Sequence, residues 1–249
     1  MNKPIRALAA ALLMSGGLLS SAYANVIVGG TRVIFPAKDG EVTVRLTNQN
    51  ATPALVEAWI DSGDAKSTPD KVNTPFLITP PLFRMEPNRD QSLRILFTHS
   101  EQPLPTDRES VFYLNVLEVP PKPSGPQFQG KNYIQLALRS RLKLFYRPAG
   151  LAGDPQKAPS ALSFKASSDA GAAALVVHNP TPYYVTIGSI TVDVGGTSHS
   201  VDTGMVAPLS DLRLAIKDMT QAPSAGSQIK YDCINDYGAD VILKGSVSP

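Results

Sequence analysis

The sequence predicts an all-β protein built from two β-sandwich domains, and three observations lead to this prediction. Apolar and polar residues alternate with a period of two in many short runs, as they do in strands with one buried face. Pro and Gly residues, 22 and 18 of the 249, separate these runs as turn residues would. No convincing stripe of apolar residues at helical spacing is present. Many short strands joined by turns are typical of sandwiches rather than of α/β layers.

The chain begins with a predicted secretory signal peptide over residues 1–24. Lys3 and Arg6 form a short basic start, an uncharged apolar stretch follows, and Ala22-Tyr23-Ala24 fits a small-x-small cleavage site. A buried N-terminal helix is the alternative interpretation. The apolar stretch is too short to span a membrane, and no later segment is long enough. We therefore expect an exported protein whose mature chain begins at Asn25.

Removal of the signal peptide would leave no excess of basic residues. The whole chain has 23 basic and 21 acidic residues, and two of the basic ones belong to the signal, so the mature chain has 21 of each. A nucleic-acid partner would require a net basic surface or stripe, so none is expected. About 225 mature residues (249 less 24) suit one large or two ordinary domains.

The first predicted domain covers residues 25–147 and contains about seven strands. The stretch "EVTVRLTN" alternates between apolar and polar residues, as a half-buried strand does. The stretch "SVFYLNVLEV" is apolar on both faces apart from Asn115 and Glu118, which is the pattern expected in the middle of a sandwich. Seven strands fit an immunoglobulin-like domain, although the Cys-Trp-Cys pattern of antibody domains is absent.

The second predicted domain covers residues 148–249. A stretch rich in Gly, Pro and Ala follows Pro148, and strand patterns then resume. Gly195-Gly196 lies between two such patterns and predicts a tight hairpin. Cys233 is the only thiol, so no internal disulfide can form, and its strand-like surroundings favour a buried, inert side chain over a reactive one.

The stretch Asn132–Pro148, "NYIQLALRSRLKLFYRP", is predicted to form one long strand with two contrasting faces. Apolar residues occupy one face of this predicted strand: Ile134, Leu136, Leu138, Leu142 and Leu144. Cations occupy the other: Arg139, Arg141 and Lys143. The apolar face could belong to the core of its own domain or could await a partner, and the alternation alone does not distinguish these.

Chemistry typical of enzymes is missing from the sequence. The three histidines have no neighbours at metal-ligand spacing, and no nucleophile-elbow, phosphate-loop or zinc-protease motif occurs. Asp61 and Asp64 in "DSGDAKS" are interpreted as a solvated turn. We therefore expect no catalytic residue, no metal site and no cofactor.

Seven stretches of the sequence, in order, closely resemble the PapD-like family of periplasmic chaperones in chaperone–usher pilus assembly. They are "TRVIF", "EAWID", "ITPPLFRMEP", "DRESVFYLNVLEVPP", "KLFYRP", "NPTPYYVT" and "INDYG". The resemblance implies two immunoglobulin-like sandwich domains in an L-shaped (boomerang) arrangement with a cleft between them. It also implies that the partners are pilus or fimbrial subunits, which lack their last strand, and an outer-membrane usher that receives them.

The resemblance assigns roles to three groups of residues. Ile134, Leu136 and Leu138 would form the donor strand that fills the groove of an incomplete subunit. Burial of three such side chains would stabilise a complex by roughly 5–9 kcal/mol before ordering costs. Arg32 and Lys143 would bind the C-terminal carboxylate of the subunit. Glu109, Arg147 and Asp236 would form an ion network between the domains.

Three classes of function compete at this level. The first is a subunit-binding chaperone without enzymatic activity. The second is an exported immunoglobulin-like adhesin or surface-binding module, and the third is a hydrolase whose site is not visible in the sequence. The "KLFYRP" stretch and the apolar alternation before it favour the first. A further hypothesis is that the free chaperone forms a self-capping homo-oligomer, because a bare apolar edge invites pairing.

Overall fold

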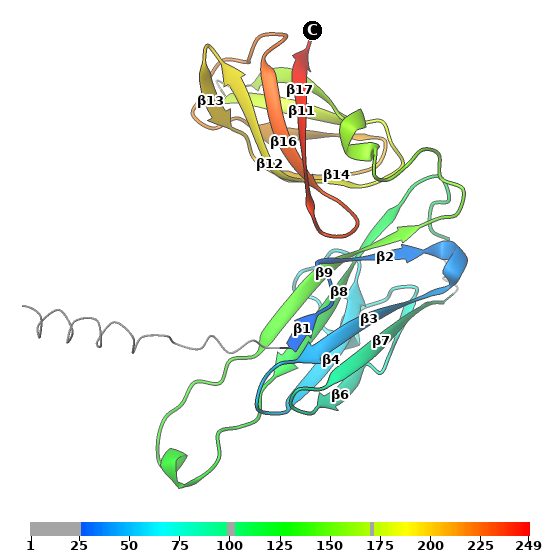
Figure 1. The fold of residues 1–249 in the computed structure, drawn as a ribbon, viewed down its shortest axis with the longest axis vertical. Helices are drawn as coiled ribbons and strands as arrows, with labels where there is room; N and C mark the ends of the chain where they lie inside the picture. The colour runs from blue at the N-terminus through cyan, green and yellow to red at the C-terminus, as the bar shows by residue number, and fades with distance from the viewer. Residues whose placement is uncertain (1–25, 99–102, 170–171) are drawn as a thin grey trace, which may run out of the picture.

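The computed structural model describes residues 26–98, 103–169 and 172–249, and it confirms the all-β class with two immunoglobulin-like sandwich domains. The predicted signal peptide, residues 1–24, lies outside the described residues. The two domains join end to end at an angle, which gives the molecule its L-shape (Figure 1). Within the described ranges, no helix is long and apolar enough to cross a membrane.

The first domain consists of two sheets packed face to face, and their strand pairs are antiparallel except for β2 with β9. One sheet has the strand order β1 (Val26–Val28), β3 (Glu41–Asn48), β7 (Asp90–Phe97) and β5 (Phe76–Thr79). The other has the order β2 (Arg32–Pro36), β9 (Leu138–Arg147), β8 (Ser110–Val119), β4 (Ala54–Asp61) and β6 (Leu82–Met85). Short 3-10 helices lie in the connections: η1 (Ala37–Asp39), η2 (Pro69–Lys71) and η3 (Pro126–Phe128).

These sheets contain nine strands over the described residues, whereas the sequence analysis expected about seven. The difference arises because the chain is interrupted at two places and changes sheet at each. β1 and β2 are separated by Gly29, Gly30 and Thr31, and Gly30 has a φ of 120°, a conformation that favours glycine. β5 and β6 are separated by Pro80-Pro81, which have no N–H to donate to a ladder.

The strand predicted over Asn132–Pro148 is shorter than expected, because β9 begins only at Leu138. Its pairing with β8 ends at Glu118 opposite Leu138. Beyond β8 the chain continues into Pro120 and Pro121, which lack the N–H groups needed to extend the ladder. Residues 132–137 therefore belong to the long connection that extends away from the first domain in Figure 1, and they have no strand assignment.

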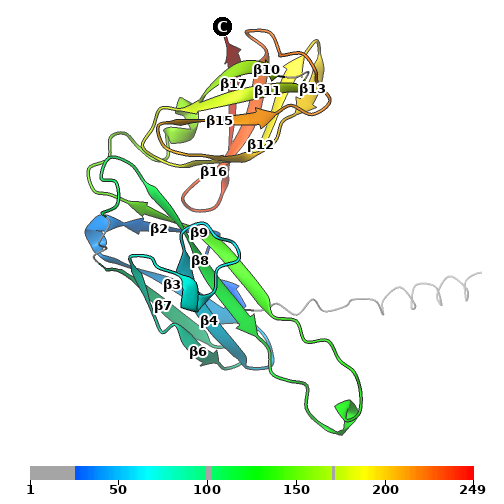
Figure 2. The same ribbon diagram turned by 180° about the vertical axis from the view of Figure 1, so that it is seen from behind.

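The second domain also has two layers, seen from the opposite side in Figure 2. One layer contains β10 (Ser163–Asp169), β11 (Ala172–Asn179) and β15 (Ser210–Ala215). The other contains β12 (Val185–Val194), β13 (Thr197–Ser200), β14 (Gly204–Val206), β16 (Gln228–Ile234) and β17 (Asp240–Ser248). A short parallel contact between β10 and β17 joins the layers, and η4 (Ala158–Ala161) precedes them.

Local predictions in the second domain agree with the structure. Val194 pairs with Thr197 across Gly195-Gly196, and both glycines have positive φ values, 59° and 83°, as the predicted tight hairpin requires. The thiol of Cys233 is fully buried, and burial raises its pKa to about 12, so it is an inert core side chain.

Each domain has its own hydrophobic core. Phe35, Leu46 and Leu93 are fully buried in the first domain, and Leu175 and Val192 are fully buried in the second. β9 ends at Arg147 and the next described strand begins at Ser163. The predicted boundary after residue 147 thus falls between the last strand of one core and the first strand of the other.

Candidate functional site

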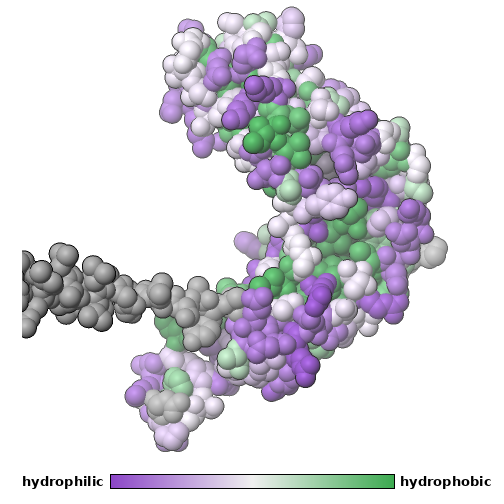
Figure 3. All heavy atoms as spheres, in the orientation of Figure 1, coloured by the Kyte–Doolittle hydropathy of each residue, from purple (hydrophilic) through white to green (hydrophobic). Residues whose placement is uncertain are grey.

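Two cations lie side by side where the domains meet. Arg32 on β2 and Lys143 on β9 are register partners on adjacent parallel strands. Arg32 Nη1 donates a hydrogen bond to the carbonyl oxygen of Ile234 at 2.9 Å, and Lys143 Nζ donates to Thr186 Oγ1 at 3.3 Å. Both acceptors belong to the second domain. The pair therefore lies where the two domains contact each other. The molecule is hollowed between the domains on one side (Figure 3).

No ion pair with a carboxylate balances the charges of this pair within the part of the chain that the structure describes. Among the described residues, neither Arg32 nor Lys143 has an acidic side chain within ion-pair distance, and Arg32 Nε is buried without a hydrogen-bond partner. Burial lowers the pKa of Lys143, and the positive charge of Arg32 lowers it further. Burial also lowers the pKa of Arg32, while Asp236 opposes this. Two partly desolvated cations with a free donor form a site suited to an anion.

A second charged cluster, beside the first, links the two domains directly. Arg147 Nε donates to Glu109 Oε1 at 2.6 Å, and Arg147 Nη1 and Nη2 donate to the Asp236 carboxylate at 2.8 and 3.1 Å. Glu109 also accepts the backbone N–H of Tyr184 at 2.8 Å. Burial alone would lower the pKa of Arg147, but hydrogen bonds and charges of Asp236 and Glu109 outweigh it and raise that pKa. The structure thus brings all three predicted network residues together.

The apolar strip predicted on one strand divides into two halves with different surroundings. Ile134, Leu136 and Leu138 are 87%, 71% and 46% exposed. Leu142 and Leu144 are buried in the first domain. The alternative that the whole strip faces its own core therefore applies to the second half only, and the first half is largely exposed apolar surface.

The edge of β9 leads from this exposed segment to the two cations. β2 pairs with β9 only from Lys143 to Arg147, so residues 138–142 of β9 have no partner on that side among the described residues. Arg32 is the first residue of β2 and Lys143 its partner. The free edge therefore ends at the cation pair, which aligns an apolar strip, unpaired backbone groups and an anion site along one line.

Sequence reasoning missed a buried polar network under the start of β9. Asp61 is almost fully buried, and Arg141 binds its carboxylate through Nε at 2.9 Å and Nη2 at 2.6 Å. Asn115 donates to Asp61 at 2.8 Å and accepts from Arg139 Nε at 2.9 Å. The interpretation of Asp61 as part of a solvated turn is wrong, because β4 ends inside the sheet beside β8. Asn115, a polar residue in an apolar strand, was the signal that could have indicated this network.

The cations on the outer face of β9 also stack on aromatic rings. The guanidinium carbon of Arg139 lies 4.7 Å from the ring centroid of Trp59, and that of Arg141 lies 3.6 Å from that of Tyr113. Arg139 and Arg141, which the sequence analysis placed on the same face as Lys143, therefore have partners within the first domain. Of these three, Lys143 has neither an ion pair nor a ring contact among the described residues.

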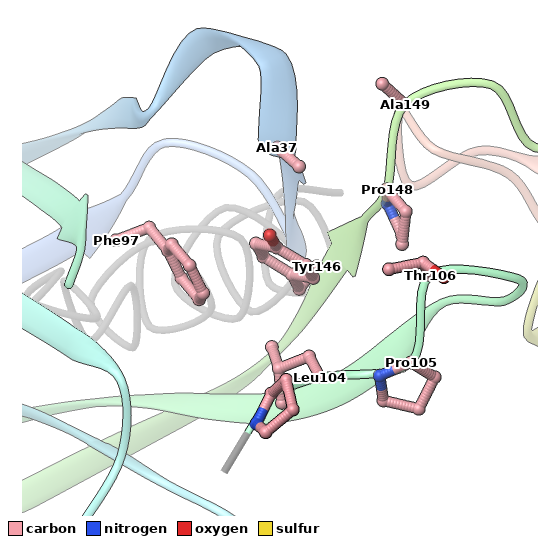
Figure 4. A pocket seen from close by; sticks show the side chains of 9 residues that line it. Ala37, Phe97, Leu104, Pro105, Thr106, Tyr146, Pro148 and Ala149 are labelled. Atoms are coloured by element: carbon pink, nitrogen blue, oxygen red, sulfur yellow. The ribbon is translucent and has the colours of Figure 1, made fainter. Parts of the chain in front are cut away.

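An apolar cavity of about 340 Å³ lies on another part of the first domain (Figure 4). Phe97 and Tyr146 stack with ring centroids 4.6 Å apart on its wall, and Leu104 and Pro148 line it as well. None of the described residues that line it is charged. The cavity therefore has no part in the anion site. Elsewhere in the described ranges, no group of three or more potential metal ligands comes together.

Comparisons with known proteins identify the class of this two-domain protein. Residues 25–152 match the family described as "Pili and flagellar-assembly chaperone, PapD N-terminal domain", and residues 157–244 match "Pili assembly chaperone PapD, C-terminal domain". The chain is 45% identical to the chaperone protein FimB/FhaD of Bordetella pertussis over 236 residues, which cover 94% of this chain and 92% of that protein.

Solved structures agree with the sequence relatives. The crystal structure of the YadV chaperone has a TM-score of 0.76 and 37% identity, covering 90% of this chain and all of that one. The SafB chaperone of Salmonella enterica, solved in complex with the SafA pilin, has a TM-score of 0.72 and 28% identity, covering 92% and 99%. This chain belongs to the PapD-like family of pilus-assembly chaperones, which are not enzymes.

Proposed function

We propose that the mature protein is a periplasmic chaperone that completes pilus or fimbrial subunits with its own residues 134–138 and delivers them to an outer-membrane usher. The observation that carries this proposal is the alignment of the exposed apolar strip, the free edge of β9 and the cation pair. The complex of SafB with a pilin supports a subunit as the partner. The uncleaved chain would enter the periplasm through the predicted signal peptide.

The exposed strip suits an incomplete sandwich. A subunit that lacks one strand has an apolar groove between two open edges, and both features promote aggregation. Ile134, Leu136 and Leu138 share one parity, so they can enter the groove together while the backbone pairs with the edges. In the free protein Ile134 and Leu136 have few contacts to lose, since they are largely exposed, and Leu138 is about half-exposed.

The cation pair sets the direction of the guest strand. A C-terminal carboxylate held between Arg32 and Lys143 would supply the missing partner for the buried Arg32 Nε. The guest strand would then run along β9 toward Lys143, which is parallel to β9 and collinear with β2. Charge-assisted hydrogen bonds of this kind contribute about 1.5–3 kcal/mol each. Such an anchor also prevents a one-residue slip, which would turn the apolar side chains out of the groove.

The Arg147, Glu109 and Asp236 cluster would hold the two domains at the angle that forms the cleft. Arg147 is the last residue of β9, so this strand and the segment directly before it carry the proposed donor residues, Lys143 of the anchor and this link. The self-capping homo-oligomer fits the same surface, because a second copy could cover the strip when no subunit is present. An adhesin or surface-binding module is the competing proposal, but it does not explain why Arg32 and Lys143 lie together.

Co-purification from the periplasm with pilus subunits tests the proposal. Wild-type protein is expected to bring down subunits, whereas Lys143→Ala and Arg32→Ala should fold normally and leave the subunits to be degraded. Lys230→Ala, which removes an exposed cation from β16, is the matched control and should retain them. Normal subunit levels with both cleft variants would contradict the anchor, and the absence of any subunit with wild type would contradict the chaperone function.

A further inference from the structure

The first half of β9 is held by two arginine side chains at the place where it lacks a second neighbouring strand. Among the described residues, residues 138–142 pair with β8 on one side only, because β2 begins to pair at Lys143. A strand with an open edge is the part of a sheet that opens most easily. Arg139 and Arg141 lie in this half, and their side chains are only 27% and 23% exposed. Cations on the outer face of a sheet are ordinarily far more exposed than this.

Each of these arginines reaches across β8 to β4. Arg141 binds both carboxylate oxygens of Asp61, at 2.6 and 2.9 Å, although its own register partner on β8 is Asn115. Arg139 donates from Nε to Asn115 Oδ1, and its guanidinium lies over the ring of Trp59. Trp59 and Asp61 both belong to β4, which is two strands away from β9. The two side chains therefore run diagonally over three adjacent strands and connect them on the outer face of the sheet.

The same contacts extend to the connection that follows β4. Arg139 Nη1 donates to the carbonyl oxygen of Ala65 at 2.9 Å, and the Trp59 indole donates to Ser67 Oγ at 3.3 Å. Asp61 accepts the backbone N–H of Gly63 at 2.8 Å and is itself 1% exposed. A planar arginine fork that binds a buried carboxylate through two nitrogens has little freedom to take another rotamer. The backbone of β9 that carries such a side chain is therefore restrained as well.

We infer that Arg139 and Arg141, together the arginine clasp, are positioning residues for strand donation, which hold the open edge of β9 extended so that a guest strand can pair with it. Addition of a strand requires an extended edge, and an edge that is already ordered lowers the entropic cost of binding. The clasp lies on the outer face of β9, so it leaves Leu138 on the other face, and the edge itself, available to the guest. The inference rests on the proposed function.

A comparison of subunit binding with stability tests this inference in the two-domain protein. We expect Arg139→Gln and Arg141→Gln each to bind a pilus subunit about tenfold more weakly than wild type, measured by competition for a limiting amount of subunit. Amide hydrogen exchange of residues 138–142 in the free variants should be about tenfold faster. Val44→Ala, which removes two methyl groups from a buried position on β3 in the opposite sheet, is the matched control. It should lower the thermal midpoint of the first domain and keep wild-type affinity for the subunit.

Arg141→Lys distinguishes the geometry of the clasp from its charge. This variant retains a positive charge near Lys143, but a lysine has no planar fork to bind both oxygens of Asp61. We expect it to lose affinity for the subunit as Arg141→Gln does. Wild-type affinity in Arg141→Lys would overturn the inference, because it would show that a positive charge is sufficient.

The remaining outcomes are also decisive. Wild-type affinity in both glutamine variants, or a loss of affinity no larger than that of Val44→Ala, would overturn the inference. Arg141→Gln leaves Asp61 without its arginine fork, so Arg139→Gln, which retains the Asp61–Arg141 pair, decides the matter if Arg141→Gln does not fold. Failure of wild type to bind any subunit would overturn the proposed function together with this inference. Binding by wild type with equal affinity in the clasp variants would overturn the inference alone.

Discussion

The proposed donor segment, residues 134–138, offers the sharpest prediction, because its apolar side chains are exposed to different degrees in the free protein. Full burial of a Leu or Ile side chain contributes about 1.5–3 kcal/mol. Ile134 is 87% exposed, so nearly all of this stabilisation remains available when a subunit binds. Leu138 is 46% exposed, so about half of its stabilisation is already present in the free protein. Across the three donor residues the available burial is about 3–6 kcal/mol before ordering costs.

Truncation of Ile134 should therefore weaken subunit binding without affecting the chaperone itself. We expect Ile134→Ala to lose about 1–2 kcal/mol of binding free energy, which is about 5- to 30-fold in affinity. The thermal midpoint of the free chaperone should not change. Leu138→Ala should lose less affinity and should lower the midpoint, since Leu138 is half-buried against its own domain.

Competition between each variant and wild-type chaperone for a limiting amount of subunit measures these affinities, and thermal unfolding measures the midpoints. Ile242→Ala is the matched control, because Ile242 is 67% exposed on β17 of the second domain. The reasoning is refuted if Ile134→Ala binds as well as Ile242→Ala does. It is also refuted if Ile134→Ala destabilises the free chaperone, since that would show a contact with its own domain.

Three further predictions concern the rest of the chain. Burial raises the pKa of Asp61, but hydrogen bonds from Arg141 and Asn115 lower it to a net value of about 2 from the ordinary 3.8. The stabilisation of about 2 kcal/mol from this shift is present above pH 4 and is lost as the pH falls through 2. Urea unfolding between pH 5 and pH 2 should show this loss in wild type and not in Asp61→Asn. Trp59 is the only tryptophan and stacks under Arg139, so Arg139→Gln should change the emission spectrum, and an unchanged spectrum would count against the stacking. The Cys233 thiol should resist alkylation at neutral pH until the second domain unfolds, and rapid labelling of native protein would contradict its burial.

Local features of the fold were predictable because they depend on neighbouring residues only. Alternation in residues 41–48 predicted a half-buried strand, and the structure buries Val44 and Leu46 while their polar neighbours are largely exposed. Gly195-Gly196 predicted a hairpin because few other residues adopt the required φ values.

Features that depend on which strands are neighbours were not predictable from the sequence. Arg141 binds Asp61 across 80 positions of sequence, and this contact requires β9, β8 and β4 to lie in that order. The start of β9 at Leu138 depends on where β8 ends, which no pattern within residues 132–148 reveals. The exposed half and the buried half of the apolar strip have the same alternation of residues. Only the position at which the sheet begins, Leu138, distinguishes them.

β2 pairs with only the second half of β9, and this would limit the length of the subunit segment (the client) that can bind along the first half. β2 occupies the edge of β9 from Lys143 onward, so a guest strand on that edge cannot continue past Lys143. The nine residues from Ile134 to Lys143 span about 30 Å when extended. A client whose chain continues further than this beyond the residue paired with Ile134 would collide with β2, and one that ends sooner would not reach the cations. The chaperone would in this way measure the length of a client's last segment as well as its hydrophobic pattern.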